Sequence, residues 1–377
     1  MSVRRSRTPA SSGRLRRTLA GAMVAGLSVT ALSACDAGDA APSASPSSGP
    51  AGDSDDRVPF RVKSNVAGQK VVPVDRTVRL SAAGGSLRSV TVSSEAGELS
   101  GRLEGAGSSW TATALPEPGV AYRVHAVAER ADGKRVVRDS TFRTQALTLD
   151  EQTYASVAPL QGETVGVGMP VIVTFDVPVT DKVSIEKHMT VDSAPRQVGS
   201  WHWLSDTEAH WRPKSYWQAG TEVSVDLDIN SVPAGAGVYG QESRTVDFTV
   251  GDANIIKVDA QSHQMRVFRN GELLRTLPIT TGKPGFTTRS GVKVIIEKFR
   301  EKRMNSETVG IDRDNPEYYD IDDVEYAMRV TYSGEFIHAA PWSVGSQGSA
   351  NVSHGCTGMS TTDAGWLYDM TKRGDVG

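Results

Sequence analysis

Residues 351–360, NVSHGCTGMS, hold the side chains of this chain that are best suited to chemistry. Cys356 is one of only two cysteines among 377 residues, and His354 lies two positions before it. A thiol is a useful nucleophile when a nearby base or positive charge favours the thiolate. From these residues alone, Cys356 can be a buried apolar residue, a metal ligand or a nucleophile.

The surroundings of this cysteine favour the nucleophile. On a strand, His354 and Cys356 would point to the same face. Gly355 and Gly358 let the backbone approach a substrate closely, and they expose N–H groups that can hold an oxyanion. His338 lies upstream as a further base, and histidine is the side chain that titrates near neutral pH.

The N-terminal segment predicts export. Its first 34 residues carry six arginines and no acid, and residues 19–34 are uncharged and mostly small or apolar. This is the pattern of a secretory signal, and the apolar run is shorter than the roughly 20 residues of a membrane-spanning helix. The run ends in Leu32-Ser33-Ala34-Cys35, which resembles a bacterial lipobox. We therefore expect a signal peptide over 1–34 and an exported protein anchored by lipidated Cys35 to the outer face of the cytoplasmic membrane; an ordinary signal peptide with an incidental cysteine is the alternative.

Charge and cysteine content bear on the class of partner and on the reactivity of Cys356. The formal net charge is −3 and the pI about 6.2, which does not favour nucleic-acid binding. Removing residues 1–34 leaves 35 basic and 44 acidic residues. If Cys35 is lipidated, Cys356 is the one free thiol, and an unpaired cysteine in an exported protein indicates a reactive group.

The middle of the chain predicts a tether followed by two β-sandwiches. Residues 35–57 are rich in Ala, Ser, Pro, Gly and Asp and cannot bury a core, so we interpret them as a disordered tether. Residues 58–145 and 146–251 contain short alternating runs typical of immunoglobulin-like domains. Trp201 and Trp203 lie two positions apart and share one face of a predicted strand. A face for stacking sugars is one interpretation of these tryptophans, and core packing is the one we favour.

Residues 252–377 form a third predicted unit, rich in strands. Asn270-Gly271 predicts a hairpin turn, residues 300–323 are polar, and residues 360–374 predict a helix capped by Ser360 and ended by Gly374. Asp-Val after that helix is the expected approach to another strand, so we expect a C-terminus truncated at Gly377. His263 is expected to have no role beyond its strand.

The segment FIHAAPWSVGSQGSANVSHGCTGMS resembles the active-site signature of the L,D-transpeptidase (YkuD-domain) family. That signature is a histidine, 14–17 residues, and then Ser/Thr-His-Gly-Cys; here 14 residues separate His338 from Ser353. The layout of lipoprotein signal, two immunoglobulin-like domains and catalytic domain is similar to that of actinobacterial members. The implied fold is mainly β, with a helix after the active-site cysteine.

The resemblance implies a role for each matching residue. Cys356 would attack the carbonyl of the third residue of a tetrapeptide stem, release D-alanine and pass the acyl group to a diamino-acid amine, making 3→3 cross-links. His338 would be the general base, oriented by the carbonyl of Ala339. His354 would bind or polarise substrate, and the N–H groups of Gly355 and Cys356 would hold the oxyanion. The other substrate-binding residues implied are Ser353, Thr357, Trp342 and Ser343. A lid over 300–320 would add Met304, Tyr318 and Tyr319.

One position departs from the family pattern, because many members have Asn where this chain has Gly358. Any side-chain hydrogen bond from that position is therefore in doubt. No cofactor and no metal is expected, the partner is the peptidoglycan stem peptide, and a monomer is expected. Two alternatives stay open: a non-catalytic wall-binding lipoprotein, and a zinc-dependent peptidoglycan hydrolase that uses the two histidines and the thiolate as ligands.

Overall fold

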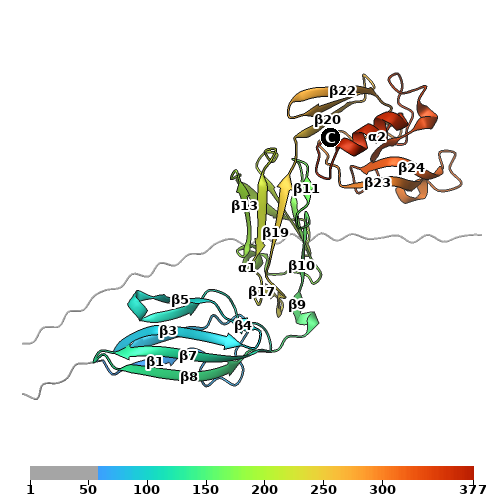
Figure 1. Cartoon of the computed structure of the whole chain (residues 1–377). Coiled ribbons are helices and arrows are strands. Elements are labelled where there is room, and N and C mark those ends of the chain that lie inside the picture. Colours follow the sequence, from blue (N-terminus) through green and yellow to red (C-terminus); the bar gives the residue numbers. More distant parts are fainter. Residues whose placement is uncertain (1–57) are drawn as a thin grey trace, which may run out of the picture. The chain divides into compact units, whose positions relative to one another are not determined.

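The computed structural model describes residues 58–377. The predicted signal peptide, Cys35 and the predicted tether lie outside this described part. Within it, no helix is long and apolar enough to cross a membrane. The described residues are mainly strands, as predicted, and these fall into three groups along the chain (Figure 1).

The first group is a two-sheet sandwich with sheet orders β1-β2-β6-β5 and β4-β3-β7-β8. Along β7, alternate residues are buried, so Tyr122, Val124 and Ala126 enter the core while their neighbours face solvent. Asp132-Gly133 turns β7 into β8, with Gly133 at φ 79°, a backbone conformation that favours glycine in hairpin turns. The elements are β1 (Arg61–Ser64), β2 (Arg79–Ala83), β3 (Gly85–Ser94), β4 (Gly97–Glu98), β5 (Gly101–Glu104), η1 (Gly105–Gly107), β6 (Ser109–Ala112), β7 (Ala121–Arg130) and β8 (Arg135–Arg143).

The second group has sheet orders β10-β12-β15-β14 and β11-β19-β16-β13, with a small sheet β17-β18-β9. The elements are η2 (Leu149–Glu151), β9 (Gln152–Thr153), β10 (Ala155–Ala158), β11 (Thr164–Val165), β12 (Val171–Phe175), α1 (Lys182–Glu186), β13 (Met189–Ala194), β14 (Gly199–Trp203), β15 (Glu208–Pro213), β16 (Glu222–Leu227), β17 (Pro233–Gly235), β18 (Val238–Gly240) and β19 (Arg244–Val250).

The tryptophans of this second group pack inward. Trp211 and Trp217 are buried and stack at 5.2 Å between ring centroids. Trp201 and Trp203 share one face of β14 and pack against the same core, where Trp203 stacks on Phe175. The rings are therefore core residues, and the arrangement does not favour a sugar-stacking face.

The third group contains a meander, β20-β21-β22, and a four-stranded sheet, β23-β24-β25-β26. Asn270-Gly271 turns β21 into β22 with both residues at positive φ, as predicted. The two ends of the polar stretch 300–323 lie in β23 and β24, which pair with each other, and residues 306–319 connect these strands. The elements are β20 (Asn254–Asp259), β21 (Gln264–Arg269), β22 (Glu272–Pro278), β23 (Glu297–Asn305), η3 (Ser306–Val309), β24 (Asp320–Arg329), β25 (Phe336–Ala339), η4 (Pro341–Ser343), β26 (Thr357–Met359) and α2 (Thr361–Met370).

Helix α2, labelled in Figure 1, follows the short strand β26. Its Ala364 and Leu367 pack into the core of this third group. The Ser360 hydroxyl accepts a hydrogen bond from the Asp363 amide, which confirms the predicted cap. The predicted end at Gly374 is wrong, because the helix stops at Met370 and Thr371 is extended. The Thr371 hydroxyl donates back to the Leu367 carbonyl, which satisfies one of the free carbonyl groups of the last turn.

Candidate active site

The two strands that carry the signature residues are neighbours in one sheet. Strand β25 pairs in parallel with β26, and this register places His338 opposite Gly358. Cys356 immediately precedes β26, so the pairing brings the thiol and the imidazole to the same end of the sheet. This position follows from backbone register and does not depend on the side chains themselves.

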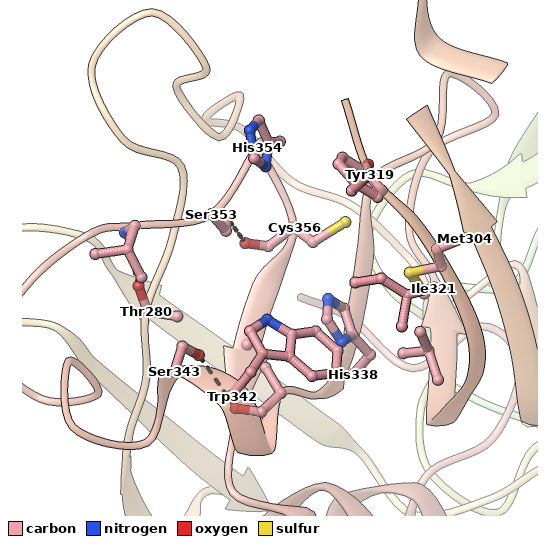
Figure 2. Close-up of a pocket in the computed structure, with 14 residues that line it drawn as sticks. Thr280, Met304, Tyr319, Ile321, His338, Trp342, Ser343, Ser353, His354 and Cys356 are labelled. Carbon is pink, nitrogen blue, oxygen red and sulfur yellow. Dashed lines mark hydrogen bonds between the residues drawn. The ribbon is translucent and has the colours of Figure 1, made fainter. Parts of the chain in front are cut away.

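A cavity of about 250 Å³ opens at this place. Figure 2 shows its side chains, with the Cys356 sulfur, the His338 imidazole and the Trp342 indole facing the same space. The cavity brings together most of the predicted site residues. Its lining residues are Thr280, Met304, Tyr319, Ile321, Val324, His338, Ala340, Trp342, Ser343, Val352, Ser353, His354, Cys356 and Gly358.

Cys356 is the one cysteine among the described residues, and it is partly exposed to the cavity. The surrounding protein raises the pKa of its thiol to about 11, mainly through burial, which disfavours the thiolate. The sulfur lies 3.8 Å from the Gly334 carbonyl oxygen, an acceptor for the S–H group. The resting nucleophile is therefore a neutral thiol, which needs a base to react near pH 7.

His338 is the buried base candidate, held at one nitrogen. Its Nδ1 lies 2.7 Å from the carbonyl oxygen of the adjacent Ala339. A carbonyl oxygen only accepts, so Nδ1 carries the proton and Nε2 keeps its lone pair. Burial lowers the pKa of His338 and outweighs the opposing effect of this hydrogen bond, which keeps the imidazole neutral and ready to accept a proton. The Trp342 ring lies 5.9 Å from the imidazole at an angle of 30°.

Ser353 braces the turn that presents the cysteine. Its hydroxyl donates to the Cys356 carbonyl at 2.6 Å and accepts from the Gly355 amide at 3.1 Å. The prediction that the Gly355 amide holds an oxyanion is therefore wrong for this arrangement, because that amide is already engaged. The Cys356 amide makes no hydrogen bond within residues 58–377, so this second predicted donor is available.

His354 lies on the opposite side of the cysteine from His338 (Figure 2). The expectation that His354 and Cys356 occupy a strand is wrong, because Gly355 adopts φ 119° and the chain bends there before β26 begins. His354 still lines the cavity, and its imidazole contacts the rings of Phe286 and Tyr319. Its Nε2 lies 2.7 Å from a carboxylate oxygen of Glu317.

The lid segment contributes Met304 and Tyr319 to the cavity, in keeping with their prediction. Tyr319 is partly buried beside the cysteine, and burial raises the pKa of its phenol to about 12. Tyr318 does not line the cavity, and its hydroxyl lies 3.5 Å from a carboxylate oxygen of Asp320. Thr357 does not line the cavity either, because side chains alternate along β26 and Thr357 is buried on the other side of that strand.

Three further positions lie at the cavity wall: two residues that were expected there, and the glycine that departs from the family pattern. Trp342 and Ser343 both line the cavity, as predicted. At Gly358, a Cβ atom would lie 2.9 Å from the Ala340 Cβ and 3.1 Å from the Thr280 Cγ2. A side chain at this position therefore requires its neighbours to move, so glycine fits the local packing of this chain.

Residues that sequence reasoning missed complete the surroundings of the cavity. Thr280, Ile321, Val324 and Val352 add side chains to its wall, and Glu317 contacts His354 from the lid. Only proximity in the fold marks these residues, since the sequence holds many similar ones. His263 does not line the cavity; its Nδ1 lies 3.0 Å from the Asn351 side-chain oxygen.

The zinc alternative finds no support in this geometry. In the part of the chain that the structure describes, no three side chains of His, Cys, Asp or Glu gather closely enough to hold a metal ion. His338 is oriented through Nδ1 by the Ala339 carbonyl, and His354 is oriented through Nε2 by Glu317. The arrangement is that of a thiol between two separately oriented imidazoles.

Comparisons with known proteins agree with the signature. Residues 253–376 match the model described as "L,D-transpeptidase catalytic domain", and residues 69–233 match the model described as "Bacterial Ig domain". L,D-transpeptidase 2 of Mycobacterium tuberculosis is 35% identical over 320 residues, which is 85% of this chain and 78% of that protein. L,D-transpeptidase 1 of the same species is 39% identical over 221 residues, which is 59% of this chain and 82% of that protein.

Solved structures show the same relationship. One, an L,D-transpeptidase in complex with imipenem, is 40% identical with a TM-score of 0.52 and covers 59% of this chain and 96% of its own. Another, an L,D-transpeptidase from Mycobacterium smegmatis, is 36% identical with a TM-score of 0.50 and covers 59% of this chain and 97% of its own. The predicted mainly β fold, with immunoglobulin-like modules before a YkuD-type domain, is confirmed. On its catalytic signature, its domain content and its similarity to these relatives, the chain belongs to the L,D-transpeptidase family.

Proposed function

We propose that this protein is a peptidoglycan L,D-transpeptidase in which Cys356 carries the acyl group. The observation that carries the proposal is the pairing of a neutral thiol with a neutral, oriented imidazole across one cavity. His338 donates through Nδ1 to the Ala339 carbonyl, which leaves Nε2 free as the base. The relatives named L,D-transpeptidases support the same reaction class.

In the acylation step, the Cys356 sulfur attacks the carbonyl carbon of the third residue of a tetrapeptide stem. The thiol proton passes to Nε2 of His338 as the sulfur–carbon bond forms. The Cys356 amide donates to the oxygen that becomes negative in the tetrahedral intermediate. The imidazolium then gives its proton to the departing amine, so D-alanine leaves and a thioester remains.

In the second step, the side-chain amine of a diamino acid on another stem attacks the thioester carbonyl. The amine loses a proton to His338, the carbon–sulfur bond breaks, and the thiol is restored as the amide bond of a 3→3 cross-link forms. The largely apolar wall that includes Met304, Ile321 and Val324 limits the entry of water, which would otherwise hydrolyse the thioester.

The experiment that tests this function is acylation by a carbapenem followed by intact-mass measurement. We expect one adduct on the wild-type protein and none on Cys356→Ala. Incubation with a disaccharide-tetrapeptide should then give a dimer lighter by one D-alanine than two substrates. A wild-type protein that remains unmodified and makes no dimer would contradict the proposal and favour the non-catalytic wall-binding alternative.

We also propose that the protein is exported and held at the outer face of the cytoplasmic membrane through lipidated Cys35. The support is the sequence alone, with its basic start, short apolar run and Leu-Ser-Ala-Cys ending. The wild type should fractionate with membranes in an acylated form, and Cys35→Ala should not. We also propose that the protein is a monomer, which light scattering after size-exclusion chromatography would test.

A further inference from the structure

Glu317 lies in the lid segment between η3 and β24, and its carboxylate reaches the loop of the proposed nucleophile. Its Oε2 lies 2.7 Å from Nε2 of His354 and 2.5 Å from Nζ of Lys283. The three side chains are partly exposed, at 37% for Glu317, 29% for Lys283 and 23% for His354. One carboxylate oxygen thus joins three segments that are far apart in the sequence.

The partners of this carboxylate are themselves held in place. The backbone amide of Lys283 donates to the Ser353 carbonyl at 2.9 Å, next to His354. The backbone amide of Glu317 donates to the Asn315 side-chain oxygen at 2.9 Å, which fixes the turn that presents the acid. Both ends of the contact are therefore anchored by main-chain hydrogen bonds, so the carboxylate meets the imidazole in a defined geometry.

The contact decides which ring nitrogen of His354 donates to the carboxylate. Hydrogen bonds from Lys283 and then from His354 lower the pKa of Glu317, so the carboxylate is ionised at neutral pH and only accepts. Nε2 of His354 must therefore carry a proton, and a neutral imidazole then keeps Nδ1 as an acceptor. The rings of Phe286 and Tyr319, at 4.8 and 5.1 Å between centroids, restrict the plane of the imidazole.

We propose that Glu317 is a positioning residue that fixes the orientation and tautomer of His354, with Lys283 as its counter-ion. This inference rests on the proposed function, because His354 serves as a polar contact for the bound stem peptide there. The lone pair at Nδ1 accepts an N–H of the donor peptide, and a flipped or mixed tautomer would offer a donor in its place. Since Glu317 and the cavity residue Tyr319 belong to the same lid, the lid and the nucleophile loop take up their positions together.

The test compares Glu317→Ala, Glu317→Gln and Lys283→Met in the full-length chain. The matched control is Glu307→Gln, since Glu307 is a lid carboxylate that pairs with Arg313 and does not contact His354. Loss of a hydrogen bond to a charged group typically costs roughly 10–100-fold, and a partly exposed pair belongs at the lower end of that range. We expect Glu317→Ala to lower kcat/KM about tenfold, mainly by raising KM, since the ring it positions contacts the bound peptide. Glu317→Gln should be intermediate, and the control should match the wild type.

A second measurement separates orientation from general loosening of the lid. In protein labelled with ¹⁵N-histidine, with His354→Gln used for assignment, the wild type should show Nε2–H at His354. Glu317→Ala should show a mixture of tautomers, and Glu307→Gln should not. A wild-type tautomer and a wild-type kcat/KM in Glu317→Ala would overturn the inference, as would equal losses in the control. An inactive wild type would instead refute the proposed function, and the tautomer measurement would still decide the inference.

Discussion

Replacement of His338 by glutamine should change how acylation depends on pH as well as how fast it is. The pKa of the Cys356 thiol is raised to about 11, so at pH 7 only about one molecule in 10⁴ carries a thiolate. The wild type avoids this penalty because His338 accepts the proton as the bond forms. His338→Gln must react through the pre-formed thiolate, and general-base assistance is typically worth about 10²–10⁴-fold.

The two pH profiles should therefore differ in shape. Burial lowers the pKa of His338 below its ordinary value of 6.5, so the imidazole stays neutral and the wild-type rate should be flat above that pH. The rate of the variant should rise about tenfold per pH unit, since each unit raises the thiolate fraction tenfold. The ratio of wild-type to variant rates should fall from as much as about 10⁴ at pH 7 to about 10² at pH 9.

The assay is the rate of carbapenem adduct formation, measured by intact mass in a series of buffers from pH 5 to pH 9. His202→Gln is the matched control, since His202 is exposed in β14 of the second sandwich. Thermal unfolding of each variant checks that the fold is kept. Parallel profiles for the wild type and His338→Gln, at any absolute rate, would refute the assignment of His338 as the base.

Three further changes test separate parts of the structure. Gly358→Asn should lower stability by roughly 1–3 kcal/mol through overpacking against Ala340 and Thr280, seen as a lower urea midpoint, and unchanged stability would contradict this packing. Ser353→Ala removes two hydrogen bonds worth about 1 kcal/mol each, so it should slow carbapenem acylation by roughly tenfold or more; a wild-type rate would show that this brace is dispensable. Burial raises the pKa of Asp375 from 3.8 to about 6, so the folded state binds the extra proton between these values and stability falls as pH rises through them, by about 3 kcal/mol in all. In urea unfolding, Asp375→Asn should therefore gain stability relative to the wild type between pH 4 and pH 7, and a constant difference would be evidence against this titration.

The sequence was sufficient to predict the residues that depend on local pattern. Cys356, His338 and the Ser360 cap follow from spacing and residue type, and the structure brings the first two to one cavity. The errors have a common cause, because side-chain direction depends on backbone conformation. Thr357 turns away from the cavity because side chains alternate along β26. The Gly355 amide is taken by the Ser353 hydroxyl, since the chain bends there, where a strand was expected.

Long-range contacts account for what the sequence did not indicate. Glu317 is one of many acids in a polar segment, and nothing in its neighbours distinguishes it. Its contact with His354 exists because β23 and β24 pair and return the lid to the cavity. A contact between residues 37 positions apart depends on how the chain folds, and the local sequence does not indicate it.

The parallel pairing of β25 with β26 also bears on how the connection between them can vary. The separation of base and nucleophile is set by the hydrogen-bonded register of two short strands, so it does not depend on the length of the connection over residues 340–352. An insertion within this connection leaves the register unchanged, provided that the strands still pair. A slip of one residue between the strands would instead turn His338 to the opposite face of the sheet and abolish the site without altering a single side chain.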